Sequence, residues 1–142
     1  SEFISLIAEF IKDPNEIIKS WGLQALMYLC VADCVEFSTA WEIIEEDIQN
    51  DSRSLVLEHR MRLFEAGVAE IDVENEFSIF HLDQLWQGIS SEHASVRNAA
   101  YSVLAQFFDK EPLCITLRHS REEYLRVILD RNPISSLAGL RV

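Results

Sequence analysis

Three stretches of this chain share one helical pattern of apolar and small residues, and they recur at an even step. Residues that recur three and four positions apart share one face of a helix, so each stretch predicts an amphipathic helix. The pattern residues are Ile18, Gly22, Ala25 and Leu29, then Leu57, Met61, Phe64 and Val68, then Val96, Ala100, Val103 and Phe107. At every position, the step from the first stretch to the second equals the step from the second to the third. An even step of this kind restricts the chain to folds built from similar units.

Each of the three stretches follows a turn, and each turn follows another predicted helix. The turns are Asp13-Pro14, Asp51-Ser52 and Ser91-Glu92, and the preceding helices are expected over about residues 4–11, 36–50 and 79–89. Asp13 is a good cap, with Pro14 in the first helical position, and Ser90 or Ser91 can cap the third stretch. The repeating unit is therefore a helix, a turn and a second helix.

A period of about 40 residues with paired helices is typical of HEAT and armadillo arrays. The sequence predicts an all-α fold, an α-solenoid of HEAT/armadillo-like helical hairpins with about three repeats. Residues 1–142 would form a single helical repeat domain, a fragment of a longer solenoid; the alternative is a plain helical bundle. Only four Gly and three Pro occur among 142 residues, which also favours helices. The small residues Gly22 and Ala100 would let neighbouring helices approach closely.

One stretch, residues 69–77, departs from the helical pattern. Its acidic residues alternate with apolar or amide residues, which is the two-residue period of a strand. We favour an ordinary connector between two helices. The alternative is an exposed edge that receives a basic partner through Glu70, Asp72 and Glu74.

The charge of the chain is strongly acidic and unevenly distributed. The formal net charge is −12; residues 1–109 hold 6 basic and 20 acidic side chains, whereas residues 110–142 hold 6 and 4. An acidic surface repels phosphate backbones, so nucleic-acid binding by the acidic part of the chain is disfavoured. The only basic cluster comprises Arg118, His119, Arg121, Arg126 and Arg131. We favour charge pairing with acidic residues for this cluster; contact with an acidic partner through Arg118, Arg121 and Arg126 is the alternative.

No catalytic or metal-binding motif occurs in the sequence. It contains no HExxH, no glycine-rich phosphate loop and no GxSxG elbow. Cys30 and Cys34 lie four residues apart without a second close Cys/His pair, and Cys114 is distant. We therefore expect thiols in a reducing, intracellular compartment, no cofactor, no metal and no enzymatic activity. No apolar run approaches the roughly 18 residues of a membrane span, so no membrane insertion is expected.

Two segments of the chain carry a resemblance to a known family. Residues 21–26 read Trp-Gly-Leu-Gln-Ala-Leu and residues 29–32 read Leu-Cys-Val-Ala, with Ala40-Trp41 following. Later, Leu85-Trp86 precedes Val-Arg-Asn-Ala-Ala-Tyr-Ser-Val-Leu-Ala over residues 96–105. These blocks, in this order and spacing over roughly residues 20–108, resemble the helical repeat region of the focadhesin family, including its plant counterpart.

The resemblance implies a fragment of a very long, non-enzymatic HEAT/armadillo protein of the cytoplasm. It also implies association with the SKI–exosome RNA-decay machinery, or with focal adhesions. We expect a scaffold segment that binds other proteins, with some self-association through apolar end faces. The alternatives are a tubulin-binding HEAT module, although the turns are mostly acidic or neutral, and an RNA-contacting module that would use residues 118–131.

Overall fold

The computed structural model describes residues 2–70, 76–106, 122 and 126. The elements with defined bounds within these residues are six α-helices and one 3-10 helix, with no strand among them. This confirms the all-α prediction for the described part of the chain. The chain divides into two compact units, residues 1–67 and 68–142.

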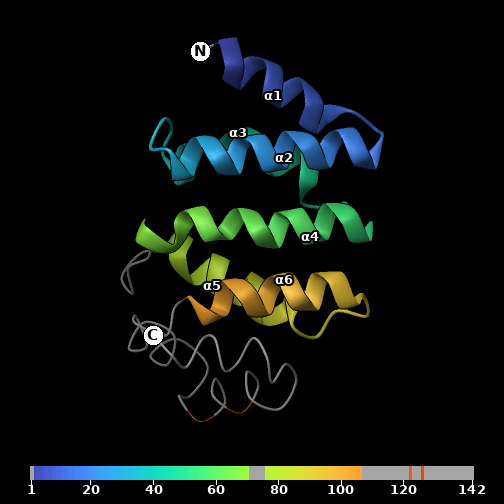
Figure 1. The fold of residues 1–142 in the computed structure, drawn as a ribbon, viewed down its shortest axis with the longest axis vertical. Helices are drawn as coiled ribbons and strands as arrows, with labels where there is room; N and C mark the ends of the chain where they lie inside the picture. The colour runs from blue at the N-terminus through green and yellow to red at the C-terminus, as the bar shows by residue number, and fades with distance from the viewer. Residues whose placement is uncertain (1, 71–75, 107–121, 123–125, 127–142) are drawn as a thin grey trace. The chain divides into compact units, whose positions relative to one another are not determined.

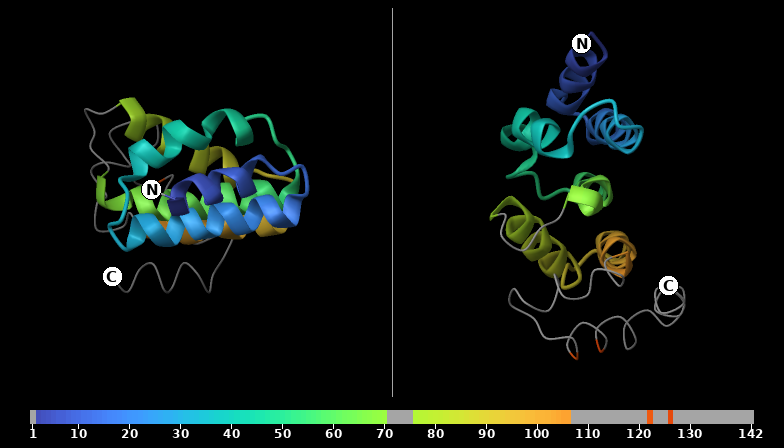
Figure 2. Two further views of the ribbon diagram at one scale, coloured as in Figure 1. Left: turned by 90° about the horizontal axis from the view of Figure 1, so that it is seen from above. Right: turned by 90° about the vertical axis from the view of Figure 1, so that its left-hand side faces the viewer.

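The first unit contains four α-helices. These are α1 (Glu2–Lys12), α2 (Glu16–Val31), α3 (Phe37–Ile48) and α4 (Ser54–Leu63), and the 3-10 helix η1 (Phe64–Glu70) begins directly after α4 (Figure 1). α1 packs against α2 and α3, and α2 packs alongside α4 (Figure 2). Helices α2 and α4 run in the same direction (Figure 1). The first two of the three repeated stretches therefore lie side by side.

The start of α2 differs from the prediction. Asn15, and not Asp13, caps the helix: its side-chain oxygen accepts hydrogen bonds from the backbone N–H groups of Ile17 at 2.9 Å and Ile18 at 3.3 Å. The Asp13 carboxylate instead accepts from the N–H of Asn15 at 2.8 Å. Asp13 thus closes a local turn two residues before the cap, which moves the helix start past Pro14.

The buried face of α2 is rotated by about one residue from the predicted stripe. Gly22 is buried as expected, but Ala25 and Leu29 are half-buried, whereas Leu23 and Leu26 are buried. A Cβ at Gly22 would lie 2.7 Å from Cγ1 of Ile11 on α1, closer than carbon atoms can pack. Glycine at this position therefore permits the close approach of α1 and α2, as the sequence predicted.

Large aromatic side chains connect α3 to the chain around α4. The Phe64 ring lies 6.2 Å from that of Phe37 and 5.2 Å from that of Trp41, between ring centroids. The buried Arg60 guanidinium lies 5.5 Å from the Trp41 ring centroid. A Cβ at Gly67 would lie 2.6 Å from the Phe37 ring, so glycine is needed beneath that ring. Aromatic burial of this kind supplies much of the stability of a small core.

The described part of the second unit contains α5 (Glu76–Gly88) and α6 (Ala94–Ala105), which pack against each other. Val96, Ala100 and Val103 are buried, which confirms this part of the predicted stripe. The predicted serine caps of α6 are wrong. The residue before the helix is His93, without a side-chain cap, and Ser91 Oγ accepts a hydrogen bond from the His93 N–H at 3.2 Å.

Several predictions concern residues that the structure does not describe. Val68 belongs to η1, but its side chain is not described. Phe107 lies outside the described residues. Within the stretch 69–77, residues 69–70 belong to η1 and residues 76–77 to α5, while 71–75 lie outside. The predicted short helix near residues 120–130 is described only at positions 122 and 126, both helical.

Candidate interaction surface

The outward face of α2 carries a stripe of exposed apolar side chains. Ile17, Trp21, Tyr28 and Val31 are 49%, 58%, 58% and 62% exposed, and the exposed Gln24 lies between them. Spacings of four, three, four and three residues place all five side chains along one line of the helix. Meanwhile Lys19 and Ser20 are buried on the inner face. The helix therefore carries apolar side chains on an exposed line as well as on its buried face, and it also buries two polar residues.

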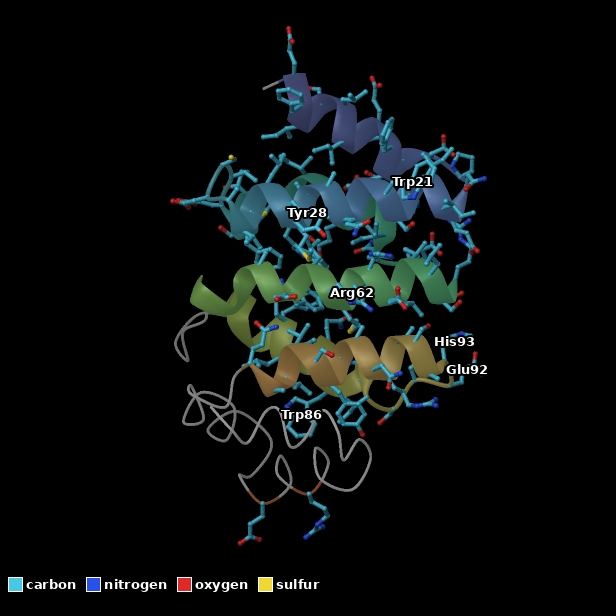
Figure 3. The ribbon with its side chains drawn as sticks, in the orientation of Figure 1. Trp21, Tyr28, Arg62, Trp86, Glu92 and His93 are labelled. Atoms are coloured by element: carbon cyan, nitrogen blue, oxygen red, sulfur yellow. The ribbon has the colours of Figure 1, made fainter. Side chains whose placement is uncertain are left out.

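A groove of about 250 Å³ lies beside this stripe, between α2 and the chain around α4. One wall is formed by Gln24, Met27 and Tyr28 of α2. The other is formed by Glu58, His59 and Arg62 of α4 together with Glu65 of η1. Figure 3 locates Trp21 and Tyr28 along α2 and Arg62 on α4. The groove and the stripe share Gln24 and Tyr28, so they form one continuous surface, called here the α2 face.

Glu58 organises the charges in the groove. Its Oε2 lies 3.6 Å from Nε of Arg62 and 3.5 Å from Nε2 of His59. Burial lowers the pKa of His59 below its usual 6.5; Glu58 opposes this shift and Arg62 adds to it. The imidazole is therefore neutral at pH 7. Two carboxylates, Glu58 and Glu65, and one guanidinium leave the groove with a net negative charge.

An ion-pair cluster holds the starts of α2 and α4 together at one end of the α2 face. Lys19 Nζ lies 3.4 Å from Asp51 Oδ2 and donates a hydrogen bond to the main-chain oxygen of Asp47 at 2.8 Å. Arg53 donates to both Asp51 oxygens, at 3.0 and 2.7 Å, and to the main-chain oxygen of Pro14 at 2.6 Å. The hydrogen bonds from Arg53 lower the pKa of Asp51 to about 2, against partial desolvation. The cluster fixes the relative position of the two helices.

The remaining surface of the first unit is dominated by acidic side chains. Residues 1–67 hold 13 acidic and 5 basic residues, a net of −8. Lys19 and Arg60 are buried, and Arg53 is bound to Asp51. Lys12 and Arg62 are therefore the remaining cations to balance the carboxylates of this unit, and Arg62 lies beside Glu58.

Of the predicted contact residues, two lie among the described ones. Arg126 is helical and exposed, and Glu70 belongs to η1. Arg118, Arg121, Asp72 and Glu74 lie outside the described residues. The sequence analysis missed the α2 face, because it considered only one stripe of this helix, Ile18, Gly22, Ala25 and Leu29. The spacing of Ile17, Trp21, Gln24, Tyr28 and Val31 indicates a second helical stripe, but spacing alone does not say which of the two stripes is buried.

Neither a metal site nor a membrane-spanning helix is found among the described residues. In the part of the chain that the structure describes, no three His, Cys, Asp or Glu side chains are grouped so that they could hold a metal ion. No described helix combines the length and hydrophobicity that crossing a membrane requires. Cys30 is half-buried and Cys34 is exposed just beyond the end of α2, while Cys114 lies outside the described residues.

In the described part of the chain, fold and surface define a helical protein with an exposed aromatic helix face beside an acidic groove. Comparison with protein families identifies it further. The family model described as Focadhesin/RST1, DUF3730 matches residues 1–104, which is most of the chain. The chain belongs to this family. No curated protein and no solved structure matches it.

Proposed function

We propose that this chain is a non-enzymatic scaffold segment of a large protein and that it binds other proteins. The single observation that carries the proposal is the exposed α2 face, where Trp21 and Tyr28 lie beside a groove. Tryptophan and tyrosine are enriched among the residues that dominate binding energy at protein interfaces. Exposing such a stripe to water is unfavourable unless a partner covers it.

The proposed architecture is an α-solenoid of HEAT-like hairpins. Its support is the even step of the three repeated stretches and the parallel, side-by-side arrangement of α2 and α4. In a stacked array, neighbouring units cover one another's apolar faces. The exposed Phe3, Leu6 and Phe10 of α1 would be such a face.

Family membership supports a more specific role. The Focadhesin/RST1 match fits a segment of a large protein. Following the family resemblance, we propose that the whole protein acts in the cytoplasm as an adaptor of the SKI–exosome RNA-decay machinery or of focal adhesions. Under this proposal the chain contributes protein contacts, and it contributes neither catalysis nor nucleic-acid binding.

The test is affinity purification of the full-length protein that contains this chain, with and without residues 1–142, followed by quantitative mass spectrometry. A scaffold role predicts that a defined set of co-purifying proteins is lost when the segment is deleted. The proposal would be wrong if the same proteins co-purify in the same amounts. A solution structure of a longer segment, with α1 packed against a preceding helical pair, would test the solenoid separately.

A further inference from the structure

The α2 face has the geometry of a surface that receives a helix. Exposed residues spaced four, three, four and three apart form the seam that one helix presents to a partner helix. Tyr28 follows Trp21 by seven positions, which is about 10.5 Å along the helix axis. A partner helix would present apolar side chains at the same interval, so that they pack between these two aromatic rings.

The charge of the surface selects among partners that could present such a helix. The groove contains Glu58 and Glu65 against one exposed cation, Arg62, which already lies 3.6 Å from Glu58. The first unit as a whole has a net charge of −8. Complementary charge therefore requires lysine or arginine on the partner. Tyr28 adds a ring face that a cation can approach within the same groove.

A second copy of this chain fits the α2 face less well than a basic partner does. Two chains facing each other through α2 would bring two acidic units together, each with a net charge of −8. Like charges across an interface are unfavourable, and a basic partner removes this repulsion.

We propose that the α2 face binds an amphipathic helical segment of another protein, with apolar residues along one side and basic residues flanking them. The apolar residues would cover Trp21 and Tyr28, and a basic side chain would reach Glu58 and Glu65 in the groove. This inference rests on the proposed scaffold function and names the chemistry of the partner.

The experiment measures binding of the 142-residue chain to a synthetic probe by fluorescence anisotropy. The probe is a labelled helical peptide of three heptads, with leucine at heptad spacing and lysine on the flanking positions. Two reference peptides carry glutamate in place of lysine, or serine in place of leucine. The proposal predicts binding of the first probe, at least about tenfold weaker binding of both reference peptides, and weaker binding as salt increases.

Three variants locate the binding site. Trp21→Ala combined with Tyr28→Ala should weaken probe binding at least about tenfold, the size expected for interface anchors. Glu58→Gln should weaken it several-fold and reduce its salt dependence. Ile43→Ala is the matched control, because Ile43 is also an exposed apolar residue but belongs to α3. Circular dichroism of each variant checks that the substitution leaves the helices folded.

Three outcomes would overturn the proposal. The first is equal binding of the lysine and glutamate peptides, and the second is an equal loss with Ile43→Ala. The third is a Trp21/Tyr28 variant that no longer self-associates but still binds the probe. This result would mean that the α2 face binds a second copy of the chain. Failure of the scaffold function is distinguishable, because it appears as unchanged co-purification when residues 1–142 are deleted. Probe binding does not depend on that result.

Discussion

Replacing Asp51 with asparagine should destabilise the first unit, because Asp51 connects the starts of α2 and α4. Its carboxylate pairs with Lys19 at 3.4 Å and with Arg53 at 2.7 Å, and only 11% of its side chain is exposed. The Lys19 side chain is 9% exposed, so Asp51→Asn would leave a nearly buried ammonium without its carboxylate. Truncating one partner of a buried pair is costly for this reason.

The size of the effect follows from the pKa of Asp51. A fall in pKa from 3.8 to about 2 measures the stabilisation of the carboxylate in the folded chain. Each pKa unit corresponds to about 1.4 kcal/mol, but 39% of the Arg53 side chain is exposed and water screens its charge, so roughly 1–2 kcal/mol should remain. The unpaired Lys19 adds to this loss, and we expect a total of about 2–3 kcal/mol at pH 7.

The pH dependence provides a second readout with a definite sign. Because the pKa of Asp51 is lowered on folding, its contribution is fully present above the usual value of 3.8 and is lost as the pH falls towards 2. The difference in free energy of unfolding between the parent chain and Asp51→Asn should therefore be constant from pH 5 to 7. It should narrow at pH 3.

Urea denaturation followed by circular dichroism at pH 7, 5, 4 and 3 measures this difference. Asp47→Asn is the matched control: it removes the same charge four residues away but keeps the main-chain oxygen that binds Lys19. The reasoning is refuted if Asp51→Asn costs less than about 0.5 kcal/mol, which is within the range of ordinary surface substitutions. A difference that stays constant down to pH 3 would equally refute the assignment of the lowered pKa.

Three further predictions concern packing and association. Gly22→Val should lower stability by roughly 1–3 kcal/mol in urea denaturation, because its side chain would collide with Ile11; an unchanged midpoint would mean that α1 and α2 are farther apart. Ala100→Leu should cost about 1–3 kcal/mol by the same mechanism, since Ala100 is fully buried, and unchanged thermal stability would show that the α6 register is wrong. Analytical ultracentrifugation should show self-association that increases with salt, because salt screens the repulsion between acidic chains. Leu6→Glu, on the exposed face of α1, should reduce this self-association. A strictly monomeric parent chain at high concentration and high salt would contradict this last expectation.

The helices of this chain were predictable because their periodicity is a property of local sequence. The stretch containing Val96, Ala100 and Val103 became a buried helix face, as its spacing required. The start of α2 was harder to predict, because Asp13 and Asn15 are both good caps and lie only two positions apart. Only the three-dimensional hydrogen bonds of Asn15 decide where the helix begins.

The interaction surface was not predictable from periodicity alone, because α2 has apolar residues on two faces. Gly22, Leu23 and Leu26 define one face, and Trp21 and Tyr28 belong to the other. Both sets satisfy helical spacing, so the sequence does not say which one faces the neighbouring helices. The contact of Gly22 with α1 decides the rotation of α2, and the aromatic residues are left exposed as a consequence.

The central claim of a protein-binding α2 face is tested most directly in the full-length protein. Trp21→Ala with Tyr28→Ala, and separately Ile43→Ala, would be introduced into the tagged protein, and co-purifying proteins would be quantified. We expect the double substitution to reduce specific partners at least about tenfold, as expected when interface anchors are lost, and Ile43→Ala to leave them unchanged. Identical partner sets from the parent and both variants would contradict the claim.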